Sequence, residues 1–269
     1  MDKSNILEII KDIKDGKMVI IVDDEARENE GDLVCAADLV TPDIINFMAS
    51  KGKGLICLPM STELCQKYDL QMMTNNNRAA NKTAFTVSIE AAEGISTGIS
   101  AADRSHTIKT AVNKYSKPSD IVQPGHVFPL KAMKGGVLSR AGHTEAACDL
   151  AKLAGLQSAG VICEIMNDDG TMARRDDLIK FGEENDIKVG TIADLIDYRL
   201  QMDATVESVL DKDVKNEFGE FKLNVWRDKI HDEYHFSLSK GDIKSVESPL
   251  VRVQTQSILQ DTLGIDELG

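Results

Sequence analysis

The chain has 269 residues, of which 42% are apolar, and it carries a formal net charge of −13. This length and composition suffice for one large hydrophobic core with a smaller appendage, whereas the negative charge argues against nucleic acid and anionic lipid as partners. Apolar runs of about 18 residues, which a membrane-spanning helix needs, do not occur, and the charged amphipathic stretch 1–17 lacks the apolar segment and cleavage site of a secretory signal.

Apolar spacing and capping residues predict alternating helices and strands over residues 1–200. In chain order we expect a helix at 6–13, a strand at 18–22, a helix from Thr41 to about Gly52, strands at 55–60 and 84–91, a helix opened by Ser100, a helix at 144–153, a strand at 161–165, and helices at 176–184 and 191–200. This alternation is typical of a layered α/β or α+β domain. From residue 202 onward, short strands at 218–225 and 234–238 indicate a small or incomplete second module.

The cysteines are spread along the chain without a Cys-x-x-Cys pair. They are Cys35, Cys57, Cys65, Cys148 and Cys163. An odd number of scattered cysteines is typical of a reduced protein without a zinc knuckle. We therefore expect free thiols and a cytoplasmic location.

An acidic segment follows the first predicted strand directly. Five of the ten residues that precede Asp32 are acidic, and Arg27 and Glu28 lie among them. Clustered carboxylates repel one another unless a cation lies between them, and hard cations such as Mg²⁺ take oxygen ligands. Two interpretations stay open on these residues alone. One is a solvated acidic turn, and the other is a ligand site at the carboxyl end of a strand.

A glycine-rich turn, GGVLSRAGHT at 135–144, leads into a predicted helix. A helix N-terminus presents free N–H groups and a partial positive charge, which suit a phosphate, and Arg140 adds a fork-shaped cation. The side chain of His143 is able to bind a metal or to carry a proton. The alternative is a capped helix with an exposed histidine.

Two further polar residues interrupt apolar segments. His126 lies between Pro124 and an apolar run, where a histidine is either a hydrogen-bonded core residue or a catalyst. Glu164 follows the apolar strand residues 161–163, and a carboxylate there is costly unless it is paired or functional. Both residues are therefore candidates for proton transfer.

Together these segments resemble the 3,4-dihydroxy-2-butanone 4-phosphate synthase family of riboflavin biosynthesis. The resemblance rests on VDDEARENEGDLV (22–34), GLICLPM (54–60), TAFTVSIEAAEGISTGISAADRSHT (83–107), KPSDIVQPGHVFPLKAMKGGVLSRAGHTEAACDLAKLAGL (117–156) and AGVICEIMNDDGTMARRDDL (159–178). It implies an α+β fold, a layered sandwich with a mixed β-sheet, over residues 1–201. It also implies a lyase that uses Mg²⁺ or Mn²⁺ and forms homodimers. One departure is local, because NRAANK (77–82) stands where many relatives have a His-Gly or Tyr-Gly pair.

The resemblance further implies which residues form the site. The metal ligands map to Glu28 and His143. The contacts to the sugar phosphate map to Arg27, Glu28, Asp32, Arg140, Ala141, Gly142, His143, Thr144 and Glu164. The residues available for proton transfer are His126, Glu164, Asp32 and Glu30. The segment 96–98 and the pair 103–104 match regions near the family's site.

The reaction that the resemblance implies converts D-ribulose 5-phosphate into L-3,4-dihydroxy-2-butanone 4-phosphate and formate. We hypothesise that the ketone is first enolised and that a divalent cation on its oxygens stabilises the enediolate. An acid would then assist loss of the C1 hydroxyl, and hydrolysis after a skeletal rearrangement would release C4 as formate. An inactive sugar-phosphate-binding protein is the alternative, and the intact metal pair and phosphate turn argue against it.

The tail, residues 202–269, is similar to the opening of GTP cyclohydrolase II. The matching stretches are NEFGEFKL (216–223) and PLVRVQTQSILQDTLG (249–264). That activity needs a zinc site of three cysteines, but the position of the first one holds Ser257, and no cysteine follows Cys163. We therefore expect a degenerate or truncated segment without GTP cyclohydrolase II activity.

Overall fold

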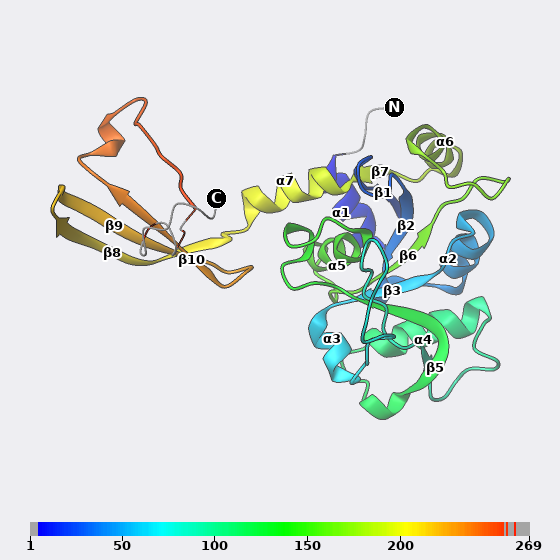
Figure 1. Ribbon diagram of the computed structural model, residues 1–269. Coiled ribbons are helices and arrows are strands. Elements are labelled where there is room, and N and C mark those ends of the chain that lie inside the picture. Colours follow the sequence, from blue (N-terminus) through cyan, green and yellow to red (C-terminus); the bar gives the residue numbers. More distant parts are fainter. Residues whose placement is uncertain (1–4, 256, 258–260, 262–269) are drawn as a thin grey trace. The chain divides into compact units, whose positions relative to one another are not determined.

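A computed structural model describes residues 5–255, 257 and 261 of the chain. The chain divides into two compact units, Met1–Thr205 and Val206–Gly269 (Figure 1). Part of the tail similarity noted above, at 256, 258–260 and 262–264, lies outside the described residues.

The first unit is built on a seven-stranded mixed sheet. Its strands are β1 (Val19–Val22), β2 (Gly31–Ala36), β3 (Cys57–Met60), β4 (Ile89–Ala91), β5 (Ile121–Lys131), β6 (Gly160–Glu164) and β7 (Val189–Thr191). The strand order is β4-β5-β3-β6-β2-β1-β7. The β1/β7 and β3/β5 pairs are parallel, and the other neighbours are antiparallel. The expected α+β fold with a mixed sheet is thereby confirmed.

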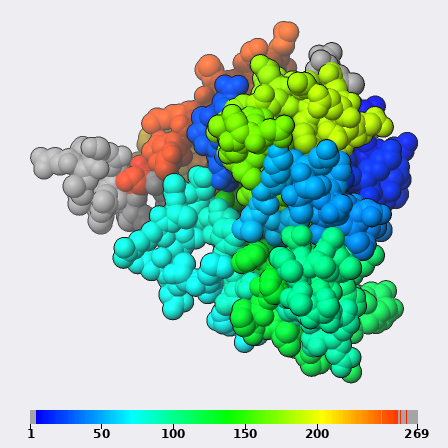
Figure 2. Space-filling view, turned by 90° about the vertical axis from the view of Figure 1, so that its right-hand side faces the viewer, coloured from blue at the N-terminus to red at the C-terminus, as the bar shows by residue number. Residues whose placement is uncertain are grey.

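Helices cover both faces of this sheet. They are α1 (Ile6–Lys14), α2 (Pro42–Phe47), α3 (Thr62–Lys67), α4 (Ala101–Val112), α5 (His143–Leu153), α6 (Arg175–Asn185) and α7 (Ile192–Met202). Val19 and Ile21 of β1 belong to a core cluster with residues of α1, α5 and α7. Ile20 belongs to a second cluster with residues of α2, α4 and α6, which lie one below another on one face in Figure 2. Because successive strand residues point to opposite faces, covering both faces accounts for the unbroken apolar run of β1.

Side-chain caps fix where several helices begin. The hydroxyl groups of Thr41, Ser100 and Thr191 accept hydrogen bonds from backbone amides three residues further on, at 3.2, 3.0 and 3.1 Å. The Asn5 side chain caps α1 in the same way through the amide of Leu7. These bonds satisfy amides that the first helical turn leaves free, so the helix starts predicted at Thr41, Ser100 and Thr191 are confirmed, whereas the Asn5 cap was not predicted.

Short connecting helices complete the first unit. They are η1 (Ala37–Leu39), η2 (Met48–Gly52), η3 (Pro118–Asp120) and η4 (Gly136–Leu138). The helical segment expected to run from Thr41 to about Gly52 is therefore α2 followed by the single π-turn η2, and Lys53 ends it with a φ of 69°. Each of the five cysteines is buried and free.

The sequence-based strand assignments were incomplete in two ways. The strand predicted at 84–91 is confined to β4, because Phe85 and Thr86 before it form only isolated bridges. The strands β2, β5 and β7 were missed. In β2 the pair Gly31 and Asp32 suggested a loop, and in β5 two prolines remove donors from the ladder.

The second unit contains an antiparallel three-stranded sheet in the order β10-β9-β8. Its elements are β8 (Val206–Asn216), β9 (Gly219–Asp228), β10 (Glu233–Ser239) and η5 (Ile243–Ser245). β9 and β10 agree with the two strands predicted in the tail, and β8 was missed. Across the part of the chain that the structure describes, no helix combines the length and apolar character of a membrane span.

Candidate active site

The acidic loop between β1 and β2 is folded around the buried side chain of Asp23. One carboxylate oxygen accepts from the backbone amide of Glu28 at 3.1 Å and from Arg27 at 2.8 Å. The other oxygen accepts from the amide of Glu30 at 2.9 Å. A solvated acidic turn would not show these contacts. The loop is therefore a shaped element that presents Glu28 to the interior, and the sequence alone did not single out Asp23 for this role.

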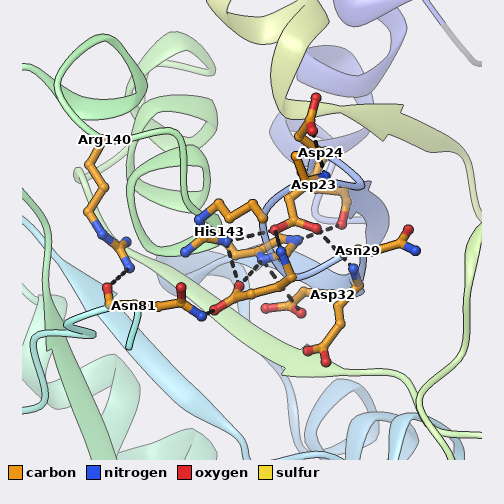
Figure 3. Close-up of polar contacts among 12 residues, drawn as sticks. Asp23, Asp24, Asn29, Asp32, Asn81, Arg140 and His143 are labelled. Atoms are coloured by element: carbon orange, nitrogen blue, oxygen red, sulfur yellow. Dashed lines mark hydrogen bonds and ion pairs between the residues drawn. The ribbon is translucent and has the colours of Figure 1, made fainter. Parts of the chain in front are cut away.

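His143 is the first residue of α5, and its ring lies beside this loop. Its Nε2 atom lies 3.1 Å from the carbonyl oxygen of Ile21, so the hydrogen is assigned to Nε2. The Nδ1 atom then faces the acids, 3.8 Å from Oε2 of Glu28 and 4.0 Å from Oδ1 of Asp32. Figure 3 shows His143 between Asp23 and Asp32 on one side and Asn81 on the other. Proteins usually orient a metal-binding imidazole by a hydrogen bond from the ring nitrogen that does not bind the metal.

Three of these groups lie close enough to surround one cation. Ligand atoms of Asp23, Glu28 and His143 all lie within 4.8 Å of one another. Asp32 adds a buried oxygen, Oδ1, which has no hydrogen-bond partner among the described residues. Buried polar atoms are nearly always satisfied, so this oxygen indicates a missing partner. The two metal ligands implied by the resemblance, Glu28 and His143, are thus brought together from positions far apart in the sequence.

The local charges shift the proton affinities of this group in opposite directions. Hydrogen bonding to His143 and the charge of Arg27 lower the pKa of Glu28 to about 2, against the effect of burial. Burial raises the pKa of Asp32 to about 7, although the nearby His143 opposes it. Burial lowers the pKa of His143, but the carboxylates of Asp32 and Glu28 outweigh this effect and raise the pKa to about 9. Perturbed values of this kind are typical of functional sites.

The turn at 135–144 places Arg140 beside the same site. Its NH1 atom donates to Oε2 of the buried Glu145 at 2.7 Å, and its NH2 atom donates to the carbonyl oxygen of Asn81 at 3.1 Å. Gly142 precedes α5, and a Cβ atom there would lie 2.4 Å from Arg140 NH1. The glycine therefore lets the guanidinium lie against the start of the helix, where Thr144 is also buried. This arrangement has the donors and the positive charge that a phosphate requires.

The 77–82 loop, where the sequence departs from many relatives, reaches into the site. Asn81 donates from Nδ2 to Oε1 of Glu28 at 2.6 Å. The next residue, Lys82, has a φ of 49°, in the left-handed region that glycine adopts most readily. Asn81 is a contact that the sequence did not predict.

Asp32 and Glu164 are direct partners across the antiparallel β2/β6 pair. Oε2 of Glu164 accepts from the backbone amide of Leu55 at 2.8 Å, so this carboxylate is hydrogen-bonded. Glu30, at the end of the acidic loop, lies 4.0 Å from Arg174, and burial raises its pKa. Three of the four proton-transfer candidates, Glu30, Asp32 and Glu164, therefore lie at or next to the start of β2 and the end of β6.

The fourth candidate, His126, lies on β5, which is separated from β2 by β3 and β6. Its ring nitrogen Nδ1 lies 2.6 Å from Oε2 of Glu90. Among the described residues, His126 makes no hydrogen bond or ion pair with Glu28, Asp32 or His143. Within one chain, the structure does not bring His126 into the cluster.

Two protein families match the chain. The family described as 3,4-dihydroxy-2-butanone 4-phosphate synthase matches residues 7–198, and the family described as GTP cyclohydrolase II matches residues 207–268. A 3,4-dihydroxy-2-butanone 4-phosphate synthase from Pseudomonas aeruginosa is 51% identical over 269 residues, which cover all of this chain and 74% of the relative.

Solved structures are similar as well. The crystal structure of RibBX, a two-domain 3,4-dihydroxy-2-butanone 4-phosphate synthase from A. baumannii, superposes with a TM-score of 0.83 at 53% identity. The match covers 89% of this chain and 70% of that one. A 3,4-dihydroxy-2-butanone 4-phosphate synthase in complex with two magnesium ions superposes with a TM-score of 0.71 at 38% identity, over 74% of this chain and 97% of that one.

Proposed function

Because the chain belongs to the 3,4-dihydroxy-2-butanone 4-phosphate synthase family, we propose that the cluster around Glu28 and His143 is the active site of this lyase. It converts D-ribulose 5-phosphate into L-3,4-dihydroxy-2-butanone 4-phosphate and formate in riboflavin biosynthesis. The observation that carries the assignment of the site is the approach of Glu28 Oε2 to His143 Nδ1, at 3.8 Å, next to the unsatisfied Oδ1 of Asp32.

The residues of the cluster fit a divalent cation. Glu28 and His143 would hold it, because His143 Nδ1 faces Oε2 of Glu28 at 3.8 Å, whereas both oxygens of Asp23 accept from backbone amides of its own loop. A cation bound there supplies a Lewis acid for the oxygens of the substrate. We propose Mg²⁺ as this ion. Mn²⁺ shares its preference for hard oxygen ligands and for carboxylates, so it is the expected substitute.

The phosphate of the substrate is proposed to lie at the start of α5. Arg140, Ala141 and Thr144 offer a guanidinium, a backbone amide and a hydroxyl there, and Gly142 leaves room for the guanidinium. Arg27 lies beside Glu28 and adds a second guanidinium. The positive end of the helix and the fork of Arg140 both favour a dianion. Holding the phosphate at this point would orient the sugar carbons toward β2.

Proton transfer is assigned to the acids on β2 and β6. Asp32 is the first choice as the base that removes the proton beside the carbonyl, because a carboxylate with a pKa of about 7 is a better acceptor than an ordinary one. Glu164 faces it across the strand pair and would contact the substrate from the opposite side. Glu30 and His126 are the further candidates for the later proton transfers.

Release of formate from D-ribulose 5-phosphate tests this function. The chain is incubated with the substrate and Mg²⁺, with EDTA, and with EDTA followed by excess Mg²⁺. We expect formate in the first and third reactions and none in the second. Absence of formate in all three would contradict the proposed activity and favour a sugar-phosphate-binding protein, whereas formate in the presence of EDTA would contradict the metal.

Further properties belong to the same proposal. We propose a homodimer, as the family resemblance implies, and a cytoplasmic location, in keeping with the free buried cysteines. We also propose that the chain has no GTP cyclohydrolase II activity, because no cysteine follows Cys163 and that chemistry needs a zinc-bound water. Incubation with GTP and Zn²⁺ tests the second point, and loss of GTP would contradict it. Sedimentation equilibrium tests the first.

A further inference from the structure

Glu90 is a buried carboxylate that the proposed reaction does not use. Its side chain is 7% exposed and lies on β4, where the pairing with β5 changes register. Ile89 pairs with Val127, but Glu90 pairs with Val122, so residues 123–126 of β5 bulge out opposite this step. Bulges redirect side chains and often lie beside active sites. The bulge at this position carries His126.

Both oxygens of Glu90 are hydrogen-bonded, and one of them holds His126 twice. Oε2 lies 2.6 Å from His126 Nδ1 and accepts from the backbone amide of His126 at 3.2 Å. Oε1 accepts from the hydroxyl of Thr107 at 3.1 Å. An ionised carboxylate only accepts, so the hydrogen of the ring is assigned to Nδ1.

The contact leaves Nε2 of His126 as the unprotonated nitrogen. The His126 side chain is 46% exposed, and Nε2 has no hydrogen-bond partner within the described residues. A neutral imidazole with a bare, accessible nitrogen is able to accept a proton from a ligand. The orientation and tautomer of the ring are therefore set by Glu90, as a carboxylate sets them in other imidazole-based sites.

The loop at 96–98 packs closely against the pair. A Cβ atom on Gly98 would lie 2.1 Å from Glu90 Oε2 and 2.5 Å from His126 Nδ1, and the φ of Gly98 is 89°. Asp103 fixes this loop, because its carboxylate accepts from the hydroxyl of Ser96 at 2.7 Å and from the amide of Gly98 at 3.1 Å. The Glu90–His126 pair is thus enclosed on the side away from Nε2.

We propose that Glu90 is a positioning residue, which holds His126 in the Nδ1–H tautomer and keeps Nε2 free to exchange a proton with a ligand. This inference rests on the proposed function, because only that function gives His126 a role in proton transfer. The orientation of the ring itself stands on the contacts of Glu90 alone. A purely structural Glu90 would stabilise the bulge through the backbone amide and would have no effect specific to the imidazole.

A double-mutant cycle separates these two roles. Glu90→Gln keeps the shape of the side chain, and we expect kcat to fall about 10- to 100-fold with KM changed less than about twofold, because groups that orient a functional imidazole have effects of this size. In the His126→Ala background the same substitution should have no further effect on kcat. Asp12→Asn, in a buried ion-paired carboxylate of α1, is the matched control and should leave kcat unchanged. An unchanged kcat in Glu90→Gln, or an equal loss with and without His126, overturns the proposal.

Nitrogen-15 NMR of the histidine ring identifies the tautomer of His126 independently of enzymatic activity. The unaltered chain should show a protonated Nδ1 and a bare Nε2 for His126 at a pH where the ring is neutral. In Glu90→Gln the carboxamide offers both a donor and an acceptor, so the Nε2–H form should gain population. A protonated Nε2 in the unaltered neutral ring overturns the proposal, even if the formate assay shows that the proposed function is wrong.

Discussion

The side chain of Asn81 donates a 2.6 Å hydrogen bond to Oε1 of Glu28, although 53 residues separate them in the sequence. The carbonyl oxygen of Asn81 accepts from Arg140 at 3.1 Å. Asn81 therefore connects a proposed metal ligand with a proposed phosphate contact (Figure 3). The 77–82 loop is consequently part of the site, although its sequence differs from that of many relatives.

We predict that Asn81→Ala weakens Mg²⁺ binding about tenfold, because partners that orient a metal ligand typically contribute 10- to 100-fold in affinity. Isothermal titration calorimetry with Mg²⁺ measures the change. Asn75→Ala is the control, because Asn75 is an exposed asparagine of the same connection. An unchanged affinity in Asn81→Ala, or an equal loss in the control, would contradict the role of Asn81.

Replacing either proposed metal ligand should abolish the response to Mg²⁺. We expect Glu28→Gln and His143→Ala each to lower the rate of formate release more than about 100-fold, because loss of a residue that merely orients a ligand already has effects of 10- to 100-fold. The exposed carboxylate of the same loop is the control, so Glu25→Gln should retain the rate. Near-normal formate release by either site variant at saturating Mg²⁺ would refute the ligand assignment.

Binding of Mg²⁺ should release a proton from His143. The metal-free ring has a pKa of about 9, so at pH 8 it is mostly protonated, and a metal ligand must be neutral. Glu28 has a pKa of about 2 and contributes no proton at this pH. The apparent affinity should therefore rise with pH until about pH 9 and level off above it.

Calorimetry at pH 8 in two buffers of different ionisation enthalpy measures this release. We expect about one proton per bound ion. Asp32→Asn should release less than one proton, because losing this carboxylate lowers the pKa of His143 and leaves more of the ring neutral before the ion binds. A release near zero would show that His143 does not bind the ion.

Arg140→Lys keeps the charge at the phosphate turn but removes the planar fork. We expect KM for the sugar phosphate to rise about tenfold, with a smaller change in kcat, because a lysine does not reproduce paired hydrogen bonds to phosphate. Initial rates of formate release give both constants. Arg175→Lys, at an exposed arginine of α6, should leave KM unchanged. An unchanged KM in Arg140→Lys would place the phosphate elsewhere.

Arg199 stabilises the first unit through a buried ion pair. Its NH1 atom donates to Asp149 and to the carbonyl oxygen of Gly135, each at 2.7 Å. Arg199→Met would leave Asp149 buried without its cation, and we expect the free energy of unfolding to fall by about 3 kcal/mol. Urea denaturation followed by circular dichroism measures it. The exposed pair of Lys180 with Glu184 is the control, and a similar loss in Lys180→Met would contradict the argument.

Much of the fold was predictable because local residues determine it. Thr41, Ser100 and Thr191 cap helices where expected, and the apolar run of β1 is buried as expected. β2 could not be found in this way. A glycine stands at position 31 of that strand because a Cβ atom there would lie 2.5 Å from Leu178, and such a contact between distant segments leaves no local pattern.

The site was predictable as a set of residues but not as a set of contacts. The acidic loop and the Arg-Ala-Gly-His-Thr turn were identified by their composition and by resemblance to the family. The sequence does not reveal which carboxylate accepts from which amide, so the loop-forming role of Asp23 appeared only in the structure. The same holds for Glu90, whose contact with His126 depends on a register shift between two strands.

The antiparallel register that places Asp32 opposite Glu164 limits how far the first unit can be stabilised. Like charges on facing positions weaken a sheet, and burial adds to that penalty. Two apolar residues at these positions should raise the stability of the protein and, if the proposed roles of Asp32 and Glu164 hold, abolish its activity. Substitutions to valine or isoleucine that aim to raise the thermal stability of the core should therefore leave this pair of residues acidic.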